Sequence, residues 1–149
     1  MSQFIGTTMP LGYAGTISRA FFDNTIEAKV NGGVKGYGVP VKLNTSTGKA
    51  EPCSATSDVV YGFAVREFVQ GSVTDAILSQ TVSVMRRGYL IVKVSGTPAI
   101  GGKVYLDANG GLSADANDGE DEPTSYTAIP NAVFVGTATD GLAEIAYNI

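Results

Sequence analysis

The sequence predicts an all-β fold, a small antiparallel β-barrel or sandwich around one core. Nineteen glycines are spread between short runs rich in Val, Ile, Thr, Tyr and Phe, which is typical of short strands joined by turns. No long stretch has the 3.6-residue periodicity of an amphipathic helix. A chain of 149 residues that is 44% hydrophobic can bury one ordinary core.

Seven segments have the composition of strands, and their spacing favours a barrel or sandwich. The longest is expected to bend at Gly88. Pro40 cannot donate to a ladder, so its strand is expected to lie at a sheet edge or to bulge there. The expected strands are Ile26–Val30, Tyr37–Leu43, Val59–Glu67, Thr81–Val94, Lys103–Asp107, Ala132–Thr137 and Leu142–Asn148.

A weak internal repeat links GVPVKLNTSTGKAE with GGKVYLDANGGLSA, 63 residues further on. Each copy carries turn chemistry, at Asn44 to Gly48 and at Asp107 to Gly111, which predicts two hairpin tips. Further along, VVYGFAV matches VFVGTAT at an offset larger by 11. We interpret this as a duplicated strand-hairpin-strand unit closing over one core. A chance similarity between two hairpins is the alternative.

The first 25 residues differ from the rest, because their apolar side chains follow neither strand nor helix periodicity. They are too apolar for a solvated tail. We therefore expect an N-terminal arm at 1–25 and a single β domain at 26–149. The arm can bury its side chains against a neighbouring subunit or partner, or wrap over its own domain. Its candidate contact residues are Phe4, Ile5, Met9, Leu11, Tyr13, Phe21 and Phe22.

Composition argues against catalysis and against cofactors. The chain has no histidine, which removes the commonest general base and the commonest zinc ligand. Its single cysteine, Cys53, excludes an intrachain disulfide and is expected to be structural. The acidic loop at 115–123 has no register that fits an EF-hand, so a solvated loop is the default and a cation site the alternative.

Charge and hydropathy limit the partners. The net charge is −4, the wrong sign for binding nucleic acid through phosphates. No run of 18 apolar residues can span a bilayer, and the N-terminus lacks the features of a secretory signal. We expect a protein made in the cytosol without membrane or direct nucleic-acid contact.

Arg86 and Arg87 stand side by side in the strand-like run SVMRRGYLIVKV. Neighbouring side chains of a strand point to opposite faces, so a bulge near Gly88 would let both reach solvent or an acidic neighbour. The alternative is a contact between the guanidinium groups and carboxylates of another subunit. Both residues are therefore candidate partner contacts.

Six segments together resemble the capsid cement, or decoration, proteins of tailed bacteriophages: MPLGYAGTISRA, GYGVPVKLNTSTGKAEP, VVYGFAVREF, SVMRRGYLIVKV, and GGKVYLDANGGLSA leading to FVGTATDGLAEIAYNI. The resemblance implies a non-enzymatic structural protein of the virion, made in the bacterial host cytoplasm. Such a protein binds the outside of the head as a homotrimer and stabilises the capsid by bridging major capsid protein subunits. It implies no catalytic residue and no cofactor.

Two other functions stay open at this level. The first alternative is a carbohydrate-binding or adhesive module of a phage tail fibre or a cell surface, which would present exposed aromatic side chains. A small β-barrel hydrolase working through carboxylates is a more remote alternative, because any three acidic residues would serve equally well.

Overall fold

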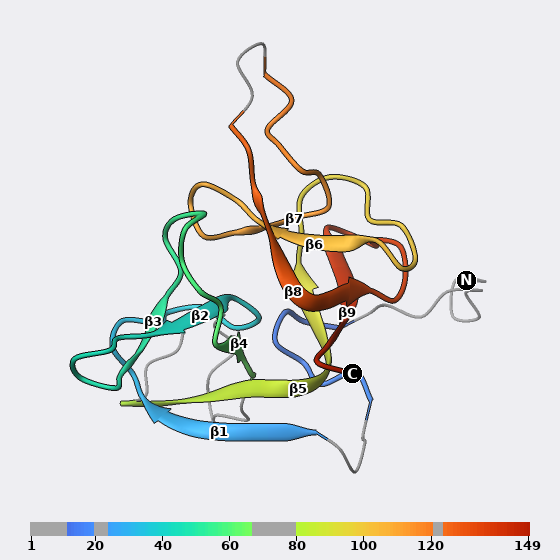
Figure 1. Cartoon of the computed structure of the whole chain (residues 1–149). Helices are drawn as coiled ribbons and strands as arrows, with labels where there is room; N and C mark the ends of the chain where they lie inside the picture. Colours follow the sequence, from blue (N-terminus) through green and yellow to red (C-terminus); the bar gives the residue numbers. More distant parts are fainter. Residues whose placement is uncertain (1–11, 20–23, 67–79, 121–123) are drawn as a thin grey trace.

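The computed structural model describes residues 12–19, 24–66, 80–120 and 124–149. Within them it contains strands and no helix, which confirms the predicted all-β fold (Figure 1). The strands are β1 (Thr25–Val30), β2 (Pro40–Leu43), β3 (Ala50–Pro52), β4 (Gly62–Ala64), β5 (Thr81–Lys93), β6 (Lys103–Leu106), β7 (Leu112–Ser113), β8 (Thr127–Phe134) and β9 (Leu142–Tyr147).

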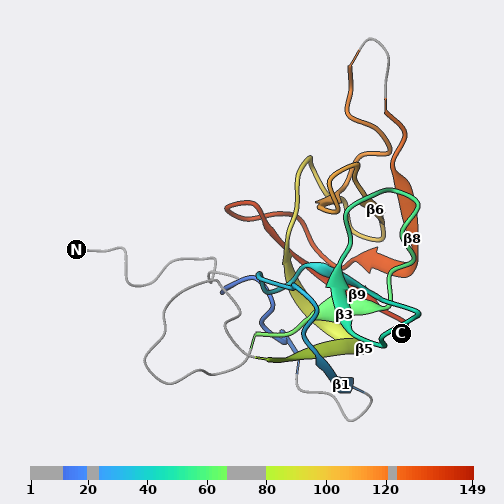
Figure 2. The same cartoon turned by 90° about the vertical axis from the view of Figure 1, so that its left-hand side faces the viewer.

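The strands form one curled antiparallel sheet in the order β3-β2-β4-β5-β9-β8-β6-β7, with β1 paired to β5 off this path. The order is symmetric, because β3, β2 and β4 on one side correspond to β7, β6 and β8 on the other. β5 is the centre of the arrangement. Its first half pairs with β1 and β4, and its second half pairs with β9. The sheet therefore bends around β5 (Figures 1 and 2).

Gly88 allows β5 to change direction, as the sequence predicts. It lies at the junction of the two halves and has φ +143°, a conformation that favours glycine. A Cβ at this position would crowd Asn24 and the side chain of Met85. The bend lets one strand belong to both halves of the sheet.

Hydrogen bonds confirm the duplication and correct its register. In the first copy, Gly38 donates its N–H to the carbonyl of Ala64 at 2.7 Å; in the second, Gly101 donates to Phe134 at 2.8 Å. The glycines are 63 residues apart, as predicted, but their partners are 70 apart, so the match of VVYGFAV with VFVGTAT is wrong by four residues. Short glycine-containing strings align by composition, whereas strand pairing fixes register by hydrogen bonding.

Both predicted hairpin tips are present. In the β2–β3 turn, Asn44 Oδ1 accepts from the N–H groups of Ser46 and Thr47. In the β6–β7 turn, Asp107 Oδ1 accepts from Asn109 and Gly111 at 2.8 Å each. The side chain at the same repeat position thus forms each turn.

The observed strands differ from the predicted ones where a strand has only a few hydrogen-bonded residues. β3 and β7, the return strands of the two predicted hairpins, have three and two residues and are not among the seven expected strands. Pro40 is the first residue of β2, which lies between β3 and β4. The expected edge or bulge at Pro40 is therefore wrong; the start of a strand is another place where a missing N–H is tolerated.

Two groups of buried side chains hold the sheet together. The larger lies inside the curled sheet and includes Phe63, Phe134 and Leu90, each at most 1% exposed. The ring of Phe63 meets that of Tyr147 edge to face, with centroids 5.1 Å apart, a favoured aromatic geometry. The smaller group packs Val41, Val82 and Val84 with other side chains of the first copy.

Candidate interaction surface

The N-terminal residues 12–19 lie along β5. The N–H of Gly15 donates to Ile91 at 2.7 Å, the N–H of Ile91 donates to Thr16 at 2.9 Å, and Ile17 forms a bridge with Leu90. This part of the expected arm wraps its own domain, one of the two alternatives. The segment covers the edge of β5 opposite β9.

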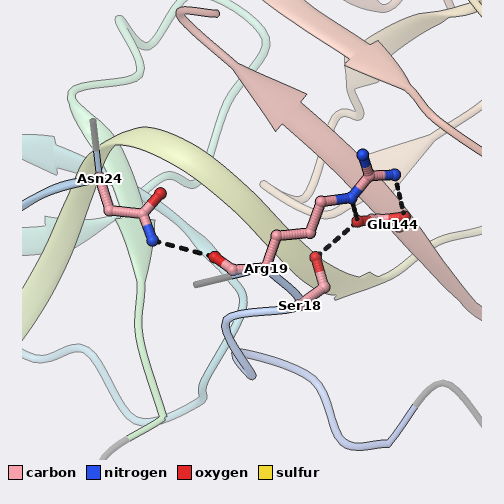
Figure 3. A network of polar contacts seen from close by, with 4 residues as sticks. All are labelled: Ser18, Arg19, Asn24 and Glu144. Carbon is pink, nitrogen blue, oxygen red and sulfur yellow. Dashed lines mark hydrogen bonds and ion pairs between the residues drawn. The ribbon is translucent and has the colours of Figure 1, made fainter. Parts of the chain in front are cut away.

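An ion pair holds the Arg19 end of this segment. Arg19 Nε donates to Glu144 Oε1 at 2.8 Å, and the hydroxyl of Ser18 donates to the same oxygen at 2.7 Å (Figure 3). The hydrogen bond and the charge of Glu144 raise the pKa of Arg19. Asn24 donates its amide to the carbonyl of Arg19 at 3.1 Å. β9 thus anchors the chain shortly before β1 begins.

Tyr13 is the one predicted arm contact within the described residues. Its side chain is 69% exposed, and the guanidinium of Arg66 lies 5.2 Å from its ring centroid and 4.7 Å from that of Tyr37. Arg66 Nε also donates to the carbonyl of Ala14 at 3.0 Å. Tyr13 is therefore fixed to the domain yet open to a partner. The other predicted arm residues, Phe4, Ile5, Met9, Leu11, Phe21 and Phe22, lie outside the described residues.

A β-bulge separates the side chains of Arg86 and Arg87. Thr25 pairs with Arg87 and Ile26 with Met85, so Arg86 is the extra residue on β5. Arg87 is exposed. The Arg86 guanidinium lies 3.6 Å from the ring centroid of Tyr61 and is partly buried. The predicted bulge is thus present, and the two arginines occupy different environments.

Tyr61 connects Arg86 to charged side chains of β1. Its hydroxyl donates to Glu27, and Lys29 lies 3.5 Å from the same carboxylate oxygen. The Tyr61 hydrogen bond lowers the pKa of Glu27, with further lowering by the charges of Lys29 and Arg86 and an opposing effect of burial. Sequence reasoning missed this cluster, although the alternation of Glu27 and Lys29 with apolar residues signals that they share a face.

Arg86 also lines a pocket of about 500 Å³ between the loop at 56–60, β8 and the end of the chain. Asn148 donates its amide to the carbonyl of Arg86 at 2.7 Å. Val59, at the same pocket, is 82% exposed. A second cavity, of about 450 Å³, lies beside the N-terminal segment and is lined by Arg66, Lys93 and Asp107 among others.

The described part of the acidic loop, residues 115–120, belongs to a projecting hairpin, which Figures 1 and 2 show extending away from the sheet. Asn117 and Ser125 form a bridge, and the N–H of Tyr126 donates to Ala116 at 2.8 Å. The exposed residues Asp118 and Glu120 lie on the described part of this hairpin. Among the described residues, no group of three Asp, Glu or Cys side chains is arranged to hold a metal ion.

Cys53 has the properties expected of a structural thiol. It is 5% exposed, and burial raises its pKa to about 12. A thiol with so high a pKa is almost fully protonated at neutral pH and is a poor nucleophile.

None of the described segments is a helix with the length and hydropathy needed to span a bilayer.

The described residues thus form a β-rich scaffold with surface pockets and a projecting hairpin. The chain belongs to the structural cement protein family (E217 gp24/Pam3 gp6), whose model matches residues 1–148. It is therefore a structural protein that stabilises a bacteriophage capsid, as its resemblance to cement proteins predicts.

A solved structure described as "The capsid of Myoviridae Phage XM1" contains a similar chain. The two are 18% identical, with a TM-score of 0.75, and the match covers 99% of this chain and 97% of the other. At this identity the likeness establishes a common fold. No curated protein sequence matches this chain.

Proposed function

We propose that the protein binds the outside of a phage head as a homotrimer and bridges neighbouring major capsid protein subunits without enzymatic activity. The match of nearly the whole chain to the structural cement family carries this proposal. A protein that binds only the assembled shell stabilises it by mass action, by about 2.7 kcal/mol per site at a hundredfold excess over Kd. Many copies on one head would multiply this effect.

The N-terminal residues are the proposed capsid or subunit contacts. Residues 12–19 are hydrogen-bonded to β5. They therefore fix the position on the domain at which the preceding residues begin. Tyr13 is held by Arg66 and remains 69% exposed. An apolar segment that orders on binding can cover a large surface. The proposed contacts before and after this anchor are Phe4, Ile5, Met9, Leu11, Phe21 and Phe22.

The alternative of a carbohydrate-binding module receives no support from the aromatic side chains. Tyr13 is the one strongly exposed tyrosine among the described residues. Tyr61 and Tyr89 face arginines, and Tyr147 is buried in the core. A flat sugar-binding platform would need several aromatic faces open to solvent together.

The test compares phage heads with and without the protein. Heads that carry it should rupture at a higher temperature, and a variant lacking residues 2–11 should bind heads more weakly while its domain unfolds at the same temperature. This deletion leaves the hydrogen-bonded residues 12–19 in place. Equal rupture temperatures, or absence of the protein from purified particles, would contradict the proposal.

A further inference from the structure

Among the described residues, no carboxylate lies within ion-pair distance of the Arg86 guanidinium, although its charge helps to lower the pKa of Glu27. Arg86 Nε is buried and has no hydrogen-bond partner within the described part of the chain. Tyr61 stacks on one face and holds the group in place. By contrast, Arg19 pairs with Glu144. A partly buried guanidinium that lacks an acceptor favours a carboxylate from outside.

The pocket beside Arg86 contains no free carboxylate that could serve. Asp58 lines it, but its oxygens accept from the N–H of Ser54 at 2.7 Å and from Lys42 at 3.0 Å. The N–H of Ser54 and the charge of Lys42 lower the pKa of Asp58 against the opposing effect of burial. Asp58 is thus engaged in its own loop. The remaining wall offers side chains such as Thr127, Asn131 and Asn148.

The acidic hairpin, residues 114–120 and 124–126, carries acidic side chains that lack a cationic partner among the described residues. Asp118 and Glu120 are exposed, and neither forms an ion pair with a cation of the described residues. Asp118 Oδ1 accepts the N–H groups of Glu120 and Thr124 within the hairpin, so Glu120 is the carboxylate available to a partner. The hairpin points away from the sheet (Figures 1 and 2), whereas the pocket lies against the sheet, on Ile129 and Pro130 of β8. A carboxylate of this hairpin is therefore placed to meet another molecule.

We propose that the pocket at Arg86 receives a carboxylate of the acidic hairpin from a second copy of the chain. The proposal rests on the homotrimer of the proposed function. In a threefold ring each contact joins two different surfaces, one from each copy. The Arg86 pocket and the acidic hairpin are two such surfaces on every copy, so successive contacts can close the ring.

Site-specific photo-crosslinking tests the contact. The photoreactive residue p-benzoylphenylalanine is placed at Val59, which is 82% exposed at the pocket, and irradiated both on heads and in concentrated protein without heads. We expect a product that joins position 59 to residues 114–126 of another copy. The same probe at Ile100, 76% exposed and absent from the pocket lining, serves as control and should give no such product.

The outcomes separate this contact from the proposed function. A protein that stabilises heads while position 59 crosslinks only to the major capsid protein, or to no second copy, would overturn the contact and leave the cement role standing. Failure to bind heads would contradict the cement role, and the reaction in concentrated protein would still decide the contact.

Charge variants test the same contact from both sides. Arg86→Ala should reduce the crosslink about tenfold or more, as expected for truncation of a charge pair. Glu120→Gln should do the same, while Asp140→Asn, an exposed acid elsewhere, should change nothing. Arg86→Glu combined with Glu120→Lys should restore the product. If Arg86→Ala fails to fold, Glu120→Gln carries the test, and a full yield from it would refute the pairing.

Discussion

Arg19 and Glu144 join the N-terminal segment to the last strand of the fold, with Nε 2.8 Å from Oε1. The two residues are 125 positions apart, and the ion pair crosses β5 beside the ring of Tyr89, whose centroid lies 4.4 Å from the Arg19 guanidinium. The contact fixes residues 12–19 at one end, while Arg66 contacts Tyr13 near the other. Residues 12–19 are therefore packed on the β domain.

Glu144→Gln should loosen the end of this segment without unfolding the protein. The Arg19 side chain is 48% exposed, so we expect a loss of about 1 kcal/mol or less in stability. Hydrogen exchange should quicken at the N–H of Ser18, which donates to Tyr89 at 3.2 Å. It should stay slow at Gly15, whose N–H bonds to Ile91. Unchanged exchange at Ser18 would show that the ion pair does not hold the segment.

Tyr61→Phe should raise the pKa of Glu27 toward its ordinary value of 4.5, because the hydroxyl that stabilises the carboxylate is removed. The folded-state pKa of Glu27 is lowered, so the stability it adds is present above about 4.5 and is lost as the pH falls through the folded pKa. The stability difference between wild type and variant should thus be larger at pH 7 than at pH 3.

Denaturant unfolding at the two pH values measures this difference, and a carboxyl titration followed by NMR measures the pKa of Glu27 itself. Tyr105→Phe is the matched control, since Tyr105 is a partly buried tyrosine of β6 outside the cluster. A pH-independent difference for Tyr61→Phe would show that the hydroxyl does not act through Glu27.

Much of the fold could be predicted because its determinants are local. Gly88 marks the bend of β5, and the turn residues Asn44 and Asp107 mark the hairpins, since each carries its own conformational or hydrogen-bonding preference. The hairpin tips imply a return strand after each of them, but the bounds of β3 and β7 could not be predicted. These strands have three and two residues, too few for a periodic pattern, and exist because β2 and β6 present open hydrogen-bonding edges to them.

The candidate site was less predictable because it depends on contacts between distant residues. Arg86 and Arg87 could be singled out as a pair, but the bulge that turns only Arg86 toward Tyr61 depends on the pairing of β5 with β1. Glu27 and Tyr61 are 34 positions apart, and no local pattern joins them. The role of the arginines in binding a partner stays a prediction.

The thiol of Cys53 should not react in the native protein. Burial raises its pKa to about 12, so the thiolate is scarce at pH 8, and the side chain is 5% exposed. We expect slow reaction with a disulfide reagent in buffer and complete reaction in denaturant. A Ser46→Cys variant in a Cys53→Ala background, at an exposed hairpin tip, should react at once. Fast native labelling of Cys53 would contradict the burial of the thiol.

Gly110 and Gly48 should respond differently to alanine, although each lies at a repeated hairpin tip with positive φ, +82° and +69°. A Cβ at Gly110 would overlap the carbonyl of Cys53, whereas a Cβ at Gly48 meets nothing within 4 Å. Gly48→Ala should cost about 1 to 2 kcal/mol of backbone strain. Gly110→Ala should cost more than about 4 kcal/mol, because the β6–β7 hairpin would have to move away from the first copy.

Denaturant unfolding of both variants measures the two losses, and Gly48→Ala acts as the control for left-handed strain alone. A large loss for Gly110→Ala together with a small one for Gly48→Ala would locate the difference in the contact with Cys53. This contact joins the second hairpin to the chain that leaves the first, so it also measures how firmly the two copies of the unit are held together. Equal losses would mean that the copies are joined through β5 and the core alone.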